Sequence, residues 1–92
     1  MATAAATEAD IFSRIFEPEK PNLSADAARS ILALDFNDKD RARMNTLSDK
    51  ARKGTLSRRE DSELERYIQV GNLLAIMQSK ARRSLRNGRA GS

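Results

Sequence analysis

One stretch decides the fold of this 92-residue chain, residues 57–86, which read SRREDSELERYIQVGNLLAIMQSKARRSLR. Acidic side chains crowd its start, apolar ones recur through its middle, and basic ones end it, an order that complements the dipole of an α-helix. Ser57 stands three residues before Glu60, the spacing of a reciprocal capping box at a helix start. The stretch therefore predicts one long helix from Ser57 to about Arg86.

The apolar surface of this helix is unusually wide. A projection at 100° per residue spreads the apolar side chains over about 200°, whereas a helix facing one core needs only about 100°. Gly71 in the interior costs about 1 kcal/mol relative to alanine, so we expect it to mark the closest approach of another helix. The residues expected to form this helix-packing interface are Tyr67, Val70, Gly71, Leu74, Ala75 and Met77.

Three shorter helices are predicted before the long one. Thr7, Ser24 and Asn37 each precede a run of helical spacing and carry a side-chain oxygen that can cap a first turn. Pro18 stops the first of these helices, and Gly54 sits where the third should end. The expected fold is all-α, a single small domain of three to four helices. We expect residues 1–21 to form an amphipathic arm and linker, 22–87 the helical domain, and 88–92 a flexible tail.

The arm carries four apolar side chains at helical spacing, Ile11, Phe12, Ile15 and Phe16. A helix of about nine residues is marginal in water unless it docks on something. It can enter a groove on another protein, as amphipathic helices do, or pack on its own body or on a second copy. The sequence leaves these alternatives open.

The composition argues against catalysis. Cysteine and histidine are both absent, which removes disulfides, thiolate and imidazole metal ligands, and the commonest general base. The acids that begin the long helix are placed where any helix favours them. We therefore expect no enzyme, no catalytic residue, no metal, no cofactor and no small-molecule substrate. Those acids are Glu60, Asp61, Glu63 and Glu65.

The sequence also argues against a membrane protein. The longest uninterrupted apolar run, residues 73–77, is far shorter than the roughly 20 residues that cross a bilayer. The first residues lack the positive flank and apolar stretch of a secretory signal. A cytoplasmic location is the resulting expectation.

The basic end of the long helix allows two interpretations. Its cations can neutralise phosphates and bind nucleic acid, but a helix C-terminus favours cations anyway, and no aromatic residue is interleaved to stack on bases. Nucleic-acid binding therefore stays as the alternative function. A second basic cluster around Gly54 is mixed with acids and is expected to be a solvated face. The cations of the helix end are Lys80, Arg82, Arg83, Arg86 and Arg89.

A helix-turn-helix over residues 38–70 fits the spacing, because Gly54 ends one helix and another begins at once. The second helix would be acidic in its first turn, where a recognition helix meets phosphates and base edges. The charge pattern therefore argues against this DNA-binding motif.

Residues 22–86 resemble a family of short bacterial helical proteins without assigned function. The resemblance rests on the following residues: Leu23 to Ala28, Leu34 to Phe36, Arg43, Met44, Leu47, Ala51, Gly54 to Leu56, Glu63, Leu64, Tyr67, Val70, Gly71, Leu73 to Ala75 and Gln78 to Arg82. Genes of that family often lie beside a gene for a small HNH-type nuclease, which implies an antitoxin-like or accessory partner. Residues 1–21 lie outside the resemblance, and Arg58 and Arg59 replace the acids that the family tends to have there.

The sequence as a whole indicates a non-catalytic protein-interaction module that associates with itself, as a homodimer for example, or with a cognate protein such as a nuclease. The mixed polar and charged side chains after the apolar middle of the long helix are expected to contact that partner. They are Gln78, Lys80, Arg82 and Arg83.

Overall fold

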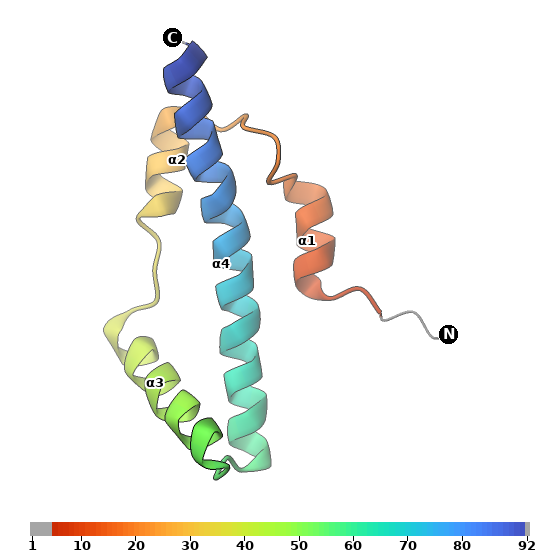
Figure 1. Cartoon of the computed structure of the whole chain (residues 1–92), viewed down its shortest axis with the longest axis vertical. Coiled ribbons are helices and arrows are strands. Elements are labelled where there is room, and N and C mark those ends of the chain that lie inside the picture. The colour runs from red at the N-terminus through yellow and green to blue at the C-terminus, as the bar shows by residue number, and fades with distance from the viewer. Residues whose placement is uncertain (1–4, 92) are drawn as a thin grey trace. The chain divides into compact units, whose positions relative to one another are not determined.

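The computed structural model of the protein describes residues 5–91, with side chains described up to residue 87. Residues 5–91 form helices and no strand, as the sequence predicts (Figure 1). The last helix is long and passes both its expected end near Arg86 and the start of the expected tail, because no proline interrupts it. The helices are α1 (Glu8–Phe16), α2 (Ala25–Leu32), α3 (Asp38–Lys53) and α4 (Arg58–Gly91).

The four predicted helix starts are confirmed. The side chains of Thr7, Ser24 and Asn37 accept hydrogen bonds of 3.1, 3.1 and 2.8 Å from backbone N–H groups three residues later. Ser57 and Glu60 form the expected capping box, in which each side chain accepts from the other's backbone N–H. These caps satisfy first-turn donors that would otherwise lack a partner within the helix.

Left-handed residues end the first and third helices. Gly54 follows α3 with φ 69° and ψ 29°, the conformation that glycine adopts without a side-chain clash. Glu17 follows α1 with φ 51°, although it carries a side chain, and its carboxylate forms an ion pair of 2.7 Å with Lys20. The predicted stop at Gly54 is therefore confirmed by its backbone geometry.

The described part of the chain divides into two compact units. One unit comprises Asp35–Gly71, and the other comprises residues 5–34 together with residues 72–91. The long helix supplies its first part to one unit and its later part to the other. Residues 5–21 thus lie in the same unit as α2 and the later part of α4.

The unit Asp35–Gly71 is a helical hairpin in which α3 packs on the first part of α4. Arg43 and Lys50 pair with Glu63 and Glu60 of α4, which places one face of α3 against α4. Leu47 lies between them on the same face and is fully buried. We call this unit the α3–α4 hairpin.

In the other unit, α1 and α2 flank the later part of α4 (Figure 1). Its fully buried apolar residues are Ala28 and Ala81, and its buried polar residues are Lys80 and Ser84. Most of the larger apolar side chains of α4 in this unit, such as Leu74 and Met77, are half-buried. We call this unit the α1–α2 unit.

Among residues 5–91, no helix combines the length and the apolar character that crossing a membrane requires.

The two glycines at 54 and 71 are expected to respond oppositely to alanine. Gly54→Ala lowers the free energy of unfolding by about 1 kcal/mol, because alanine is strained at positive φ. Gly71→Ala raises it by about 0.5–1 kcal/mol, because the site is helical and nothing lies within 4 Å of an added Cβ. Urea unfolding followed by circular dichroism measures both changes. A loss of stability in Gly71→Ala would contradict this assignment of open space.

Candidate functional site

Three polar side chains on the later part of α4 bind backbone groups of its own unit. Gln78 Nε2 donates to the carbonyl oxygens of Leu34 and Ile31 at 2.9 and 3.3 Å. Ser84 Oγ accepts from the Leu23 N–H at 3.1 Å. These bonds satisfy groups at the end of α2 and just before its start, which a helix cannot satisfy internally.

Lys80 likewise binds a backbone carbonyl group, at the C-terminal end of α1. Its ammonium donates to the Phe16 carbonyl oxygen at 2.6 Å and lies 4.5 Å from the centre of the Phe16 ring. The residue is only 6% exposed. A cation at the C-terminal end of a helix complements the helix dipole, and the aromatic face adds a further attraction.

The structure places Gln78 and Lys80, which were expected to contact a partner, against backbone groups of their own unit. Gln78 Nε2 and Lys80 Nζ each donate to backbone carbonyl oxygens at the C-terminal ends of α2 and α1, where a helix leaves carbonyl groups without internal partners. Sequence spacing gave no sign of which backbone groups would meet these two side chains.

The remaining cations of the helix end stay at the surface. Arg82, Arg83 and Arg86 are exposed, whereas the side chain of Arg89 lies outside those that the structure describes. Arg83 also lines a shallow hollow of about 450 Å³ beside Ala75 and Pro18. The basic end therefore presents three described guanidinium groups, without the ammonium of Lys80.

The four apolar side chains of α1 face two ways. Phe12 stacks on Phe16 with ring centres 5.1 Å apart, and the Phe16 ring meets Lys80 of α4. Ile11 and Ile15 are 48% and 75% exposed. The helix thus packs on its own unit through its aromatic face and keeps a free aliphatic face, which we call the Ile15 face.

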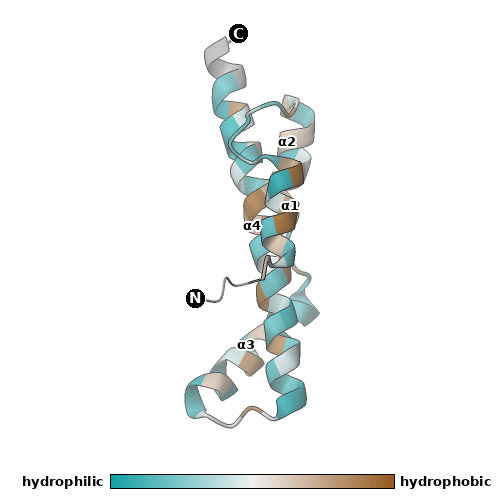
Figure 2. Ribbon diagram, turned by 90° about the vertical axis from the view of Figure 1, so that its right-hand side faces the viewer, coloured by the Kyte–Doolittle hydropathy of each residue, from teal (hydrophilic) through white to brown (hydrophobic). Residues whose placement is uncertain are grey.

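The first part of α4 also keeps large apolar side chains in solvent. Ile68 and Val70 are 53% and 51% exposed. Figure 2 shows hydrophobic residues coloured brown on α1 and on α4. Within the α3–α4 hairpin, α3 therefore covers only part of the apolar arc of α4.

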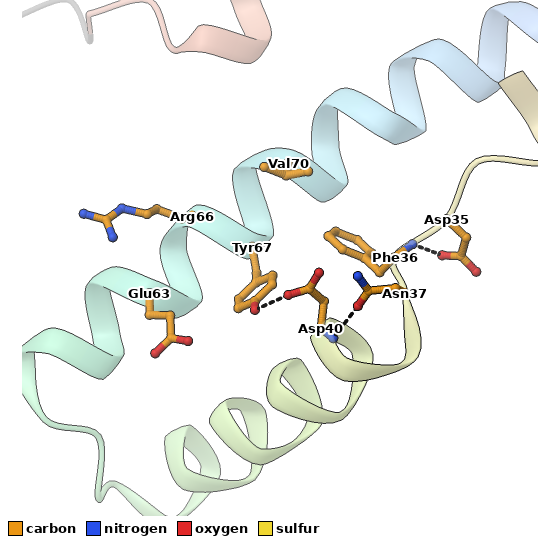
Figure 3. A pocket seen from close by; sticks show the side chains of 8 residues that line it. All are labelled: Asp35, Phe36, Asn37, Asp40, Glu63, Arg66, Tyr67 and Val70. Atoms are coloured by element: carbon orange, nitrogen blue, oxygen red, sulfur yellow. Dashed lines mark hydrogen bonds between the residues drawn. The ribbon is translucent and has the colours of Figure 1, made fainter.

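A groove of about 560 Å³ lies within the α3–α4 hairpin. Phe36 and Tyr67 meet edge to face in it, with ring centres 6.0 Å apart, and Val70 lies beside them (Figure 3). The Tyr67 hydroxyl donates to an Asp40 carboxylate oxygen at 2.7 Å. We call this the Tyr67 groove, and its lining residues are Asp35, Phe36, Asn37, Asp40, Glu63, Arg66, Tyr67 and Val70.

Two of the three carboxylates in the groove are neutralised by arginines of α3. Asp35 pairs with Arg41, and Glu63 accepts bonds of 2.9 and 2.8 Å from Arg43. This pairing lowers the pKa of Glu63, and it raises the pKa of Arg43.

Asp40 differs from these two carboxylates. Among the described side chains, no cation forms an ion pair with it, and its partner is the Tyr67 hydroxyl. This hydrogen bond raises the pKa of Tyr67, with burial as the second cause. Figure 3 shows the Arg66 side chain directed away from the Tyr67–Asp40 pair.

The six residues expected to form one helix-packing interface are divided between the two units. Tyr67 lines the groove and Val70 lies at its exposed side, while Leu74 and Met77 are half-buried in the α1–α2 unit. Ala75 is exposed, and Gly71 meets no other group of the chain within 4 Å of an added Cβ. The expected close approach at Gly71 is therefore absent among the described residues of this chain.

Sequence reasoning missed the pairing that builds the groove. In the sequence, Asp40 stands in the first turn after the Asn37 cap and Phe36 stands just before that cap, so each position has a local explanation. Their distance in sequence from Tyr67 hid the contact. The available signal was that an aromatic residue and an acid occur near the start of the predicted third helix and again in the long helix.

Comparison with known proteins finds no matching family model and no significantly similar curated protein or solved structure. In the part of the chain that the structure describes, no group of three or more acidic side chains is arranged to hold a metal ion. The geometry of the Tyr67 groove is that of an apolar groove with a charged border.

Acid is expected to weaken the α3–α4 hairpin through Glu60. The hydrogen bond from Lys50, helped by the Ser57 N–H, lowers the pKa of Glu60 from 4.5 to about 2. A carboxylate with a depressed folded-state pKa stabilises the fold above its unfolded pKa. This contribution is lost as the pH falls from about 4.5 towards about 2.

Thermal unfolding midpoints measured across this pH range test the effect. Glu60→Gln should unfold at a lower temperature than the native protein at neutral pH, and its midpoint should fall less steeply in acid. Some fall will remain, because Arg43 also lowers the pKa of Glu63. Equal acid sensitivity of the two proteins would count against the role of Glu60.

Proposed function

We propose that this chain is a small non-catalytic interaction module that assembles with itself or with a cognate protein. The observation that carries the proposal is the exposure of large aliphatic side chains on ordered helices, led by Ile15 at 75%. Ile11, Ile68 and Val70 are each about half exposed as well. Complete burial of a fully exposed aliphatic side chain is worth about 1.5–3 kcal/mol, so a side chain that is half exposed gains about half of this against a partner.

Sedimentation velocity over a dilution series tests self-association. We expect an average mass that rises with concentration, and a loss of this rise when Ile11, Ile15, Ile68 and Val70 are all changed to glutamate. These positions are exposed, so the variant should keep the native helical circular dichroism spectrum. Ser48→Glu on the exposed side of α3 is a control that should not change the mass.

The family resemblance of residues 22–86 makes a neighbouring nuclease the first cognate protein to test. Co-purification of the chain with that nuclease, and a change in cleavage when the chain is added, would support an antitoxin-like or accessory role. Unchanged cleavage together with separate elution would remove this partner from the proposal.

Nucleic-acid binding is the second candidate, favoured by the three exposed arginines of α4. Contacts of Arg82, Arg83 and Arg86 with phosphates would give an affinity that falls steeply with salt. The variant with all three changed to alanine should then bind duplex and single-stranded DNA more weakly and with a smaller salt slope. Equal binding by the native and substituted proteins would exclude this function.

A further inference from the structure

We infer that the Tyr67 groove binds α1 of a second copy of this chain, with the Ile15 face on its apolar floor and Arg14 beside Asp40. This inference rests on the self-association proposed above and names the two surfaces that meet. The groove is open and the Ile15 face is exposed, so both surfaces are accessible to a second copy.

The apolar parts of the two surfaces match in kind and in scale. Ile11 and Ile15 lie four residues apart on α1, which brings their Cβ atoms to about 6 Å from each other. The rings that form the groove floor, Phe36 and Tyr67, are 6.0 Å apart between centres, and Val70 adds an aliphatic side. An amphipathic helix lying in an apolar groove is a common mode of peptide recognition.

The charges of the two surfaces are complementary. Arg14 is exposed, lies on α1 next to Ile15, and forms no ion pair with a described carboxylate. Asp40 is the groove carboxylate without a cationic partner among the described side chains. A guanidinium placed there would meet a carboxylate and, in Phe36 and Tyr67, two aromatic rings that attract cations.

The bound helix is already ordered before it meets a partner. Its Thr7 capping box, the Phe12–Phe16 stack and the Lys80 contact hold α1 through its aromatic side, which lies about 100° around the helix from the Ile15 face. A helix that is already formed loses less conformational entropy on binding, so more of its interaction free energy contributes to affinity. Each copy offers one helix and one groove, so two reciprocal contacts close a dimer and non-reciprocal contacts extend a chain of copies.

The first test compares two isoleucine variants by sedimentation equilibrium. Ile15→Glu should weaken self-association about tenfold to a hundredfold, because a charged side chain replaces an aliphatic one on the floor. Ile68→Glu makes the same change at an exposed site that does not line the groove, and it should stay within about twofold of the native protein. Arg14→Glu should weaken association at low salt and less at high salt.

The second test uses the absence of cysteine from the natural chain. One copy carries Ile15→Cys and a differently tagged copy carries Val70→Cys, so that any disulfide between the two tags joins two chains. Mild oxidation of the mixture should yield this mixed product faster than a mixture in which Ser48→Cys replaces Val70→Cys. Ser48 is exposed on α3 and lies outside the groove lining.

The outcomes separate this inference from the proposed function. Weak association of Ile15→Glu together with the fast mixed disulfide supports the inference. Association that resists Ile15→Glu, or depends on Ile68 instead, overturns the inference and leaves the interaction module standing. One constant monomer mass over the dilution series overturns the inference and removes self-association from the proposed function, which then depends on the cognate protein.

Discussion

Leu47→Ala is expected to lower the free energy of unfolding by about 2–5 kcal/mol. Leu47 is the largest fully buried side chain among the described residues, and it lies on the face of α3 that pairs with α4. Small domains have total stabilities near the lower end of about 5–15 kcal/mol. The substitution therefore removes a large part of the stability of the α3–α4 hairpin.

Urea unfolding followed by circular dichroism at the helical band measures this loss. Leu34→Ala is the matched control, because it deletes the same atoms from a leucine that is 48% exposed. It should cost less than half as much as Leu47→Ala, since less apolar area returns to water. Equal and small losses in both variants would show that Leu47 is not the centre of the hairpin core.

Helix starts and ends were predictable from the sequence because they depend on residues close together in the chain. Thr7, Ser24 and Asn37 cap their own first turns, and Gly54 ends α3 by adopting a conformation that its neighbours need not support. The all-α class follows from these signals and from the helical spacing of the apolar residues.

The partners of α4 were not predictable in the same way. The wide apolar arc predicted cover from more than one side, but it did not indicate that α1 and α2 of the same chain would contact its later part. Lys80 shows why these contacts could not be predicted. The residue stands among the arginines of the helix end, which are exposed, whereas its own side chain is buried. Whether a lysine stays in solvent or caps another helix depends on a contact 64 residues away in sequence.

The Tyr67 groove could not be predicted from the sequence for a related reason. Tyr67 and Asp40 are 27 residues apart, and their contact needs the register between α3 and α4. That register is set by side chains such as Arg43 and Glu63, whose pairing a list of charges does not reveal. Local rules thus fixed the helices, while the arrangement of functional surfaces required tertiary contacts.

Lys80→Ala is expected to release α1 from the α1–α2 unit. The change removes a charge-assisted hydrogen bond to the Phe16 carbonyl, worth about 1.5–3 kcal/mol, and the attraction of the ammonium for the Phe16 ring. It also removes the aliphatic stem of a residue that is 6% exposed. An isolated helix of nine residues is marginal in water, so α1 should fray once it undocks.

Amide hydrogen exchange resolved along the chain measures the release. Amides of α1 should lose protection in Lys80→Ala, whereas those of α3 should keep theirs, because Arg43, Leu47 and Lys50 hold α3 within the other unit. Arg82→Ala is the control, since it removes a nearby cation that is exposed. Lys80→Met separates the two causes, because it keeps an apolar stem without the ammonium and should show an intermediate loss. Native protection of α1 in Lys80→Ala would mean that the Phe12–Phe16 face docks the helix without the ammonium.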